Sequence, residues 1–296
     1  MISESRAGVS VLIPAHDVVR FLPAALASLA AQTIDDWELI VVEDGTDDGT
    51  KAVVFEFATQ HLKHRIIYDR LQAHRGVSAA RNRALELSQG EIVAFLDADD
   101  QWEAEHLFQL MKKVGEGHML ACSSIRIWDS VNNKQLRVYE PSQTQLKNPC
   151  RGLFENSFIQ TSSCVAIPRE TIERVGRFDE YLKIGEDRDY WFRALVNGGT
   201  LGCTGSPTCR YSKHPRNSMA KTLVVAEQTV KFYEKHRKTT CLPAWLRRRC
   251  LANSLRIQGR LSRRQNPSMA QKMFLRGWRE WPLGLDLPMR ALSAYI

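Results

Sequence analysis

The sequence lacks the marks of a secreted or membrane-spanning protein. Its seven cysteines are odd in number and form no Cys-x-x-Cys pair, which argues against both a disulfide framework and a zinc-ligand pattern. No apolar run approaches the roughly 18 residues of a membrane-spanning helix. The opening segment, MISESRAGVS, has no apolar stretch of the kind found in signal peptides. We therefore expect a cytoplasmic protein with reduced, mostly buried cysteines.

Glycine is missing where two classes of enzyme need it. The segment after the first predicted strand reads PAHDVVRFLPAAL, residues 14–26. A dinucleotide-dependent oxidoreductase would carry Gly-x-Gly-x-x-Gly there. A nucleotidyltransferase would carry a Gly-rich loop with Arg or Lys. The first class is disfavoured most strongly, and the second is retained only as an alternative.

Acidic residues are scarce in the last fifth of the chain. Twelve lysines and arginines lie between 238 and 296 against only Glu280 and Asp286, whereas the whole chain has a net charge of +8. We therefore expect residues 218–296 to form a basic helical C-terminal extension with a task separate from that of the rest. Its helices should break at three prolines: Pro243, Pro267 and Pro282.

Strands and helices alternate regularly through the first hundred residues. Short apolar runs predict strands, and apolar residues at helical spacing predict the helices between them. The predicted strands are 9–14, 38–42, 65–68 and 92–96, and the predicted helices are 19–31, 51–61 and 77–88. This alternation predicts an α/β fold with a doubly wound, mostly parallel, Rossmann-like sheet. Ligands bind at the carboxyl ends of such strands, which here are 14–17, 43–48 and 97–100.

The middle third is less regular. We predict strands at 119–127 and 164–167, separated by a polar loop. A helix is expected at 187–195 and an extended segment at 200–211. The spacing of Asp100 and Glu103 also fits a capping box for a helix at 101–114.

Two acidic clusters follow predicted strands. The first, EDGTDDGT, spans 43–50, and the second, DADD, spans 97–100. A turn and a helix cap account for one or two of these acids, but not for all of them. Carboxylates after the second strand can accept hydrogen bonds from a base or ribose. Asp97 and Asp99 offer hard oxygen ligands for Mg²⁺ or Mn²⁺, and a bound cation would cancel their mutual repulsion.

Several ordered blocks together resemble a family 2 glycosyltransferase of the GT-A fold. The blocks span 9–50, 74–100 and 175–195, and they include VSVLIPAHD, SAARN and GEDRDYW. The resemblance implies a catalytic domain over 1–217, with a nucleotide-sugar half at 1–100 and an acceptor half at 101–217. It also shows departures: His16-Asp17 replaces a usual Tyr-Asn, Glu43 a usual Asp, and His74 a common Asn.

The resemblance also implies roles for individual residues. Pro14, Ala15 and His16 would close the first strand beside the nucleotide. Asp44, with Glu43 beside it, would read the base, and Arg81 would lie near the diphosphate. Mn²⁺ or Mg²⁺ would be held by Asp97, Asp99 and His214. Asp97 counts toward donor binding as well, Asp99 is expected to be the more direct ligand, and His214 has a structural role as its alternative.

The implied reaction is inverting transfer of a sugar from a nucleotide-diphosphate sugar, with UDP expected, to a hydroxyl of a glycan or lipid-linked acceptor. Such a step belongs to the synthesis of cell-surface polysaccharide or glycoconjugate. Glu186, Asp187 and Asp189 compete for the role of base, although acids are also typical of a helix N-terminus. We choose Asp187 and place Glu186 second. Trp191 fits an acceptor wall or the core equally well.

Other interpretations remain open. A catalytically inactive nucleotide-sugar-binding module would share the fold but should have lost the metal acids or the base. The basic C-terminal helices have either a solvated face or a face that adheres to an anionic membrane surface, which would place the protein at the inner face of the membrane. No nucleic-acid partner is expected, because the sequence contains no recognised module.

Overall fold

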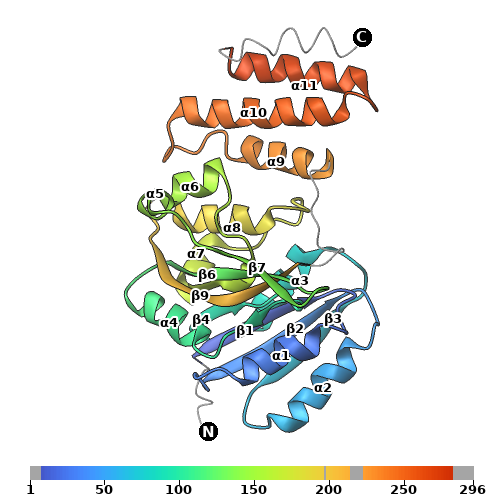
Figure 1. Cartoon of the computed structure of the whole chain (residues 1–296), viewed down its shortest axis with the longest axis vertical. Coiled ribbons are helices and arrows are strands. Elements are labelled where there is room, and N and C mark those ends of the chain that lie inside the picture. Colours follow the sequence, from blue (N-terminus) through green and yellow to red (C-terminus); the bar gives the residue numbers. More distant parts are fainter. Residues whose placement is uncertain (1–7, 197, 214–222, 283–296) are drawn as a thin grey trace. The chain divides into compact units, whose positions relative to one another are not determined.

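The computed structural model describes residues 8–196, 198–213 and 223–282. The chain divides into two compact units, drawn in Figure 1. The first unit takes in 1–181 and 186–217, and the second takes in 182–185 and 218–296. The first unit holds the sheet and its helices, and the second is helical.

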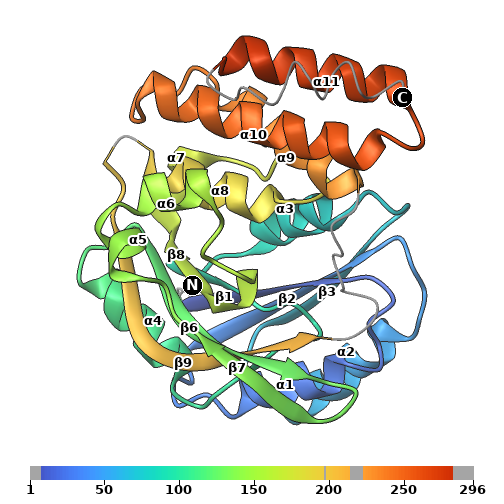
Figure 2. The same ribbon diagram turned by 45° about the horizontal axis from the view of Figure 1, so that its top comes forward.

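The first hundred residues form the predicted α/β alternation. The elements are β1 (Val9–Ala15), α1 (Leu22–Ala30), β2 (Trp37–Asp44), α2 (Thr50–Gln60), β3 (Ile66–Leu71), α3 (Val77–Leu87) and β4 (Ile92–Phe95). The four strands pair in parallel in the order β3-β2-β1-β4. β2 is buried along its whole length, because helices cover both faces of the sheet. Figures 1 and 2 place α1 and α2 on one face and α3 on the other.

The sheet continues into antiparallel and mixed pairings. Beyond β4 come β8 (Val165–Pro168), β6 (Leu120–Asp129), β9 (Leu201–Lys213) and β5 (Gln101–Trp102), and β7 (Lys134–Tyr139) pairs with β6. Over the described residues these strands make one nine-stranded sheet. Helices α4 (His106–Gly115), α7 (Arg169–Val175) and α8 (Glu186–Leu195) complete this part. The fold class predicted from the sequence is thus confirmed.

Two local predictions in the middle third are wrong. The segment predicted as a polar loop contains β7, α5 (Gln143–Lys147) and α6 (Pro149–Glu155). The helix predicted at 101–114 begins only at His106, because Gln101 and Trp102 pair with β9. Asp100 does not cap that helix. It is buried, and its carboxylate accepts hydrogen bonds from the hydroxyls of Thr161 and Ser163 and from the backbone N–H of Ser212.

The second unit contains three described helices. They are α9 (Leu223–Lys235), α10 (Ala244–Ser262) and α11 (Pro267–Glu280), and α10 packs against both of the others. Pro243 precedes α10 and Pro267 opens α11, since proline is tolerated only at the start of a helix. Pro282 lies just after α11. Within the described part of the chain, no helix is both long enough and apolar enough to cross a membrane.

Candidate functional site

A cavity of about 260 Å³ opens at the carboxyl ends of the central parallel strands. Ala15 on β1 pairs with Glu43 on β2, and Leu12 on β1 pairs with Phe95 on β4, so the three strand ends lie side by side. The cavity is lined by Pro14, Ala15, His16, Val18, Asp44, His74, Val77, Ala80, Asp97, Ala98 and Asp99. A larger cavity between α1 and α2 contains Glu56 and His61 but no cluster of acids. The cluster of acidic and histidine side chains therefore lies at the smaller cavity.

Asp44 ties the end of β2 to the loop before α3. It is only 2% exposed, and its carboxylate accepts hydrogen bonds from the backbone N–H groups of Arg75 and Gly76, both at 2.7 Å. The loops approach so closely that a Cβ on Gly45 would lie 2.2 Å from the backbone nitrogen of His74. Gly45 also has a φ of +73°, which favours glycine. Asp44 is therefore held rigidly at the cavity.

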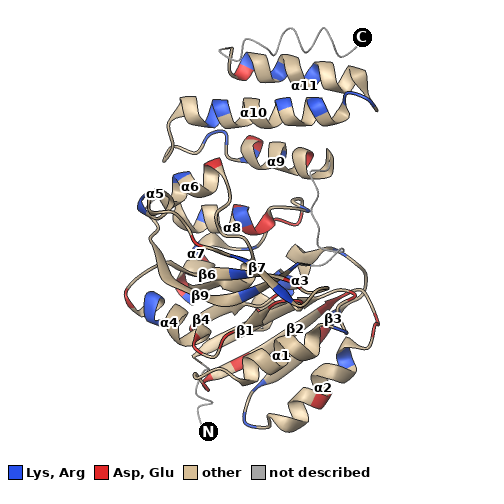
Figure 3. Cartoon of the chain, viewed as in Figure 1, with Lys and Arg blue, Asp and Glu red and all other residues tan. Residues whose placement is uncertain are grey.

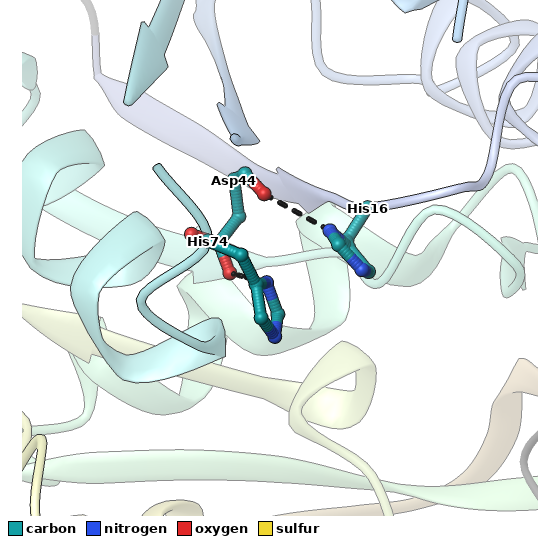
Figure 4. Close-up of side chains that lie close together, drawn as sticks. All are labelled: His16, Asp44 and His74. Atoms are coloured by element: carbon teal, nitrogen blue, oxygen red, sulfur yellow. Dashed lines mark hydrogen bonds and ion pairs between the residues drawn. The ribbon is translucent and has the colours of Figure 1, made fainter. Parts of the chain in front are cut away.

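Two histidines flank Asp44, as Figure 4 shows. Nδ1 of His74 lies 2.8 Å from Asp44 Oδ2, and Nδ1 of His16 lies 2.9 Å from the Asp44 carbonyl oxygen. The two rings stack with their centroids 4.1 Å apart. His74 was noted in the sequence only as a departure from the family pattern. The structure brings it into the cavity.

Glu43 lies beside the cavity and does not line it. It is fully buried, and its carboxylate accepts hydrogen bonds from the hydroxyls of Thr46 and Tyr68 and from the backbone N–H of Asp48. Burial and the adjacent Glu43 raise the pKa of Tyr68 well above its usual value. In the structure Glu43 therefore fixes the loop after β2, while Asp44 faces the cavity.

Arg81 joins an acid predicted to bind the metal and the donor to an acid predicted as a candidate base. It is 3% exposed, with Nη2 at 2.8 Å from Asp97 Oδ1 and Nη1 at 2.8 Å from Glu186 Oε1. Burial disfavours the charged guanidinium, but the carboxylates of Asp97, Glu186 and Asp187 outweigh it and raise the pKa of Arg81. The structure thus places Arg81 behind the cavity wall, where it balances the charge of three acids.

Asp97 and Asp99 line the cavity at the end of β4. The backbone N–H of Asp97 donates to the Ser163 hydroxyl oxygen at 2.9 Å, and this contact holds the strand end. Burial, together with repulsion from Asp99 and Asp97, raises the pKa of Asp100 well above its usual value. Two carboxylates in this position are a donor set that fits Mg²⁺ or Mn²⁺. His214 lies outside the described residues.

Glu186 and Asp187 form the first turn of α8, which starts at Glu186, one residue before the predicted start at 187. Burial and repulsion from Asp187 raise the pKa of Glu186 to about 7. Burial also raises the pKa of the half-buried Asp187, although Arg81 opposes the rise. Asp189 is fully buried and contacts Arg193 at 2.8 Å, so it is not available as a base.

Trp191 belongs to the core. It is fully buried, and its ring meets those of Phe95 and Phe178 edge-on. The interpretation of Trp191 as an acceptor wall is therefore wrong, because such a residue must be exposed to the ligand.

Sequence reasoning missed three residues that support the acids. The hydroxyls of Thr161 and Ser163 donate to Asp100, and Thr161 also lies 3.4 Å from Asp97. Tyr211, on β9, lies near the same cluster: burial and the charges of the cluster raise its pKa to about 12. No spacing in the sequence signals these residues, because the fold brings them together from distant segments: Thr161 and Ser163 come just before β8 and Tyr211 lies on β9.

The chain matches the family model described as Glycosyl transferase family 2 over residues 10–176, more than half of its length. It therefore belongs to glycosyl transferase family 2, and its architecture is the GT-A fold. The match covers β1 to α7, which includes the cavity, Arg81 and the DADD cluster. The resemblance stated from the sequence is thus confirmed.

Curated relatives agree with this membership. EpsH of Bacillus subtilis, named as a putative glycosyltransferase, is 32% identical over 213 residues, which cover 70% of this chain and 61% of EpsH. WfgD of Escherichia coli is 34% identical over 99 residues, which cover 33% of this chain and 38% of WfgD. It is named as a UDP-Glc:alpha-D-GlcNAc-diphosphoundecaprenol beta-1,3-glucosyltransferase. The chain thus spans less than two thirds of the length of these relatives.

Solved structures share the fold. S. aureus TarS 1-349 in complex with UDP-GlcNAc superposes with a TM-score of 0.70 at 17% identity, covering 97% of this chain and 89% of that one. The mannosyltransferase PcManGT from Pyrobaculum calidifontis, in complex with GDP-Man and Mn²⁺, has a TM-score of 0.64 at 18% identity and covers 98% and 87%. At such identities the likeness concerns the fold.

Proposed function

We propose that this protein is an inverting, metal-dependent glycosyltransferase. It would move a sugar from a nucleotide-diphosphate sugar to a hydroxyl of a glycan or lipid-linked acceptor during synthesis of cell-surface polysaccharide. One observation carries the proposal: Arg81 bridges Asp97, which lines the cavity, and Glu186 on α8, at 2.8 Å each. A strand-end acid that faces the donor pocket and a helix-end acid that can act as a base thus belong to one network.

The donor is expected to occupy the cavity at the strand ends. Pro14, Ala15 and His16 would flank the nucleotide, and Asp44 would accept a hydrogen bond from its base. UDP is our choice of nucleotide because TarS binds UDP-GlcNAc and WfgD is named for UDP-Glc. PcManGT instead binds GDP-Man, so GDP is the competing nucleotide.

The leaving diphosphate gains negative charge as the bond to the sugar breaks. Asp99 and Asp97 would hold Mn²⁺ or Mg²⁺ at the cavity, with His214 as a further ligand by resemblance. The bound ion would supply Lewis-acid stabilisation of the leaving group. Arg81 holds the Asp97 carboxylate in position at the cavity, and the charge of the guanidinium adds to the positive potential that the diphosphate meets.

The acceptor hydroxyl must lose its proton as it attacks. Asp187, with Glu186 beside it, would take that proton, and the new bond to the anomeric carbon would form on the face opposite the departing diphosphate. Direct displacement of this kind inverts the anomeric configuration. The raised pKa values of the pair bring its titration toward neutral pH, where a general base is most effective.

The test of this function is release of UDP from UDP-glucose or UDP-GlcNAc by the purified chain. We expect slow hydrolysis in the presence of Mn²⁺ and none after chelation, because water can replace the acceptor. Thermal melting with UDP, GDP and Mn²⁺ should show a joint rise in Tm for the matching nucleotide. A Tm rise without any nucleotide release, even with acceptor extracts, would instead support an inactive binding module.

The basic extension suggests where the acceptor is met. Along α10, Trp245, Ile257 and Leu261 are exposed to 44%, 47% and 37%. Arginines fall between them, and the Arg249 guanidinium lies 5.2 Å from the Trp245 ring centroid. Figure 3 shows Lys and Arg but no acid along α10. We include in the proposal that this α10 face adheres to an anionic membrane from the cytoplasmic side.

Vesicle sedimentation checks this adhesion. The chain should bind vesicles that contain phosphatidylglycerol and should not bind vesicles of phosphatidylcholine alone. Changing Arg249, Arg256 and Arg260 of α10 together to Gln should weaken binding by on the order of 100-fold, at about 1 kcal/mol per charge. A matched control removes three exposed charges of the first unit, namely Lys134, Arg137 and Lys147. Equal weakening by both triple variants would contradict a specific α10 face.

A further inference from the structure

The two histidines at the cavity form an arrangement that donor binding alone does not explain. The His16 and His74 rings stack at 4.1 Å with planes 30° apart, and both side chains are exposed. One potential ligand atom from each of His16, Asp44 and His74 lies within 4.8 Å of the others. This cluster joins the end of β1, the end of β2 and the loop before α3 at one point.

The contacts of Asp44 fix which nitrogen of each ring donates. A carboxylate and a carbonyl oxygen can only accept, so Nδ1 of His74 and Nδ1 of His16 must each carry the donated proton. In the neutral imidazoles, the lone pairs therefore sit on the two Nε2 atoms. Figure 4 shows both Nε2 atoms turned away from Asp44. A histidine that ligates a metal almost always donates its other N–H in this way.

We propose that His16 and His74 bind a zinc ion through their Nε2 atoms. Asp44 would act as the partner that orients His74, and water would complete the coordination. Imidazole nitrogen suits Zn²⁺, whereas the oxygen ligands Asp97 and Asp99 suit Mg²⁺ and Mn²⁺, so the two sites would select different ions. Since His16 and His74 line the donor cavity, bound zinc would occupy space that the nucleotide base needs. This last consequence, inhibition by zinc, rests on the proposed donor site.

The binding test uses the full chain without an affinity tag, stripped by chelation and titrated with ZnCl₂ in a calorimeter. Excess Mg²⁺ is present so that the carboxylate site does not take up zinc. We expect His16→Ala and His74→Asn each to weaken zinc binding by at least about tenfold, since even loss of an orienting partner costs that much. His118→Ala, a half-buried histidine on a different loop, should bind zinc like the wild type, and so should Asp99→Ala.

Cobalt distinguishes the histidines from the free cysteines. Co²⁺ bound in place of zinc should show visible ligand-field bands without a thiolate charge-transfer band. A thiolate band, absence of zinc binding by the wild type, or unchanged binding by the His16→Ala, His74→Asn double variant would each overturn the proposal. Thermal melting of the double variant ensures that lost binding does not reflect unfolding.

A competition experiment separates this inference from the proposed function. Zinc should raise the apparent Kd for UDP, measured with Mg²⁺ present, in the wild type and not in the double variant. If zinc binds as proposed but leaves the affinity for UDP unchanged, the zinc site is supported. Inhibition by zinc and the proposed position of the nucleotide base are then both wrong. If UDP binds and zinc does not, the zinc site is wrong and the proposed function stands.

Discussion

Replacing Asp187 by Asn is expected to remove sugar transfer while leaving donor binding intact. The side chain keeps its size, and its oxygen can still accept the hydrogen bond from the Arg188 backbone N–H. What is lost is the ability to take a proton, a contribution of about 10²- to 10⁴-fold to the rate. Asp187 does not line the donor cavity, so nucleotide affinity should change little.

The measurement pairs steady-state transfer, or donor hydrolysis, with calorimetric binding of UDP and Mn²⁺. Glu173→Gln on α7 serves as the matched control, because it removes an exposed carboxylate outside the network. Full activity in Asp187→Asn would place the base elsewhere. A larger rate loss in Glu186→Gln, with UDP affinity retained, would assign the role to Glu186.

The pH dependence gives a second signature of the same pair. Burial raises the pKa of both carboxyls, to about 7 for Glu186, and two adjacent acids titrate together. A base works only when it is ionised. Transfer by the wild type should therefore fall as the pH drops through the neutral range and recover as the pH rises. Residual activity of Asp187→Asn should have lost much of this slope.

The parallel half of the fold could be read from the sequence because its signals are local. The continuous apolar runs at β1 and β2 form strands that are buried on both faces, so the sequence alone indicates both the burial and the length of these strands. The acids at 97–100 follow the same logic: a strand that ends at Phe95 delivers the next residues to the sheet edge. Asp97 and Asp99 accordingly line the cavity.

The rest depended on contacts between distant segments. Asp100 has the spacing of a helix cap, but Thr161, Ser163 and Ser212 satisfy its carboxylate, and the helix begins later. The sequence predicts a loop at β7 because the segment around it is polar and rich in Asn, Gln and Ser. Pairing with β6 creates the strand. Contacts between distant segments of this kind produce no periodic pattern in the sequence.

Arg81 illustrates the same limit within the site. The sequence could indicate a charged residue near the donor, by resemblance, but not the two carboxylates that it bridges. Asp97 lies 16 residues away along the chain and Glu186 lies 105 away. Only the fold shows that the arginine is buried and neutralises acids from β4 and α8.

Asp99→Ala should abolish metal-dependent donor binding. The end of β4 crowds three acids into four residues, 97–100, and two of them, Asp97 and Asp99, line the cavity. A hard cation would relieve that crowding. When Asp99 is replaced, Asp97 is the one acid of this strand end that still lines the cavity, and it is already paired with Arg81. Loss of a charge-stabilising group of this kind costs about 10²- to 10³-fold in rate.

UDP affinity with and without Mn²⁺ decides the matter. In the wild type, Mn²⁺ should tighten UDP binding, whereas in Asp99→Ala the affinity should stay at the level measured after chelation. The variant should also melt at a higher temperature than the metal-free wild type at neutral pH. Folding raises the pKa of the Asp100 carboxyl, so the folded protein loses stability as the pH rises and this carboxyl must ionise. Removing the charge of Asp99 lowers the repulsion on Asp100 and so reduces that loss of stability. If Mn²⁺ still tightens UDP binding in Asp99→Ala, the cation is held elsewhere, and the acids at the end of β4 serve the loop rather than the donor.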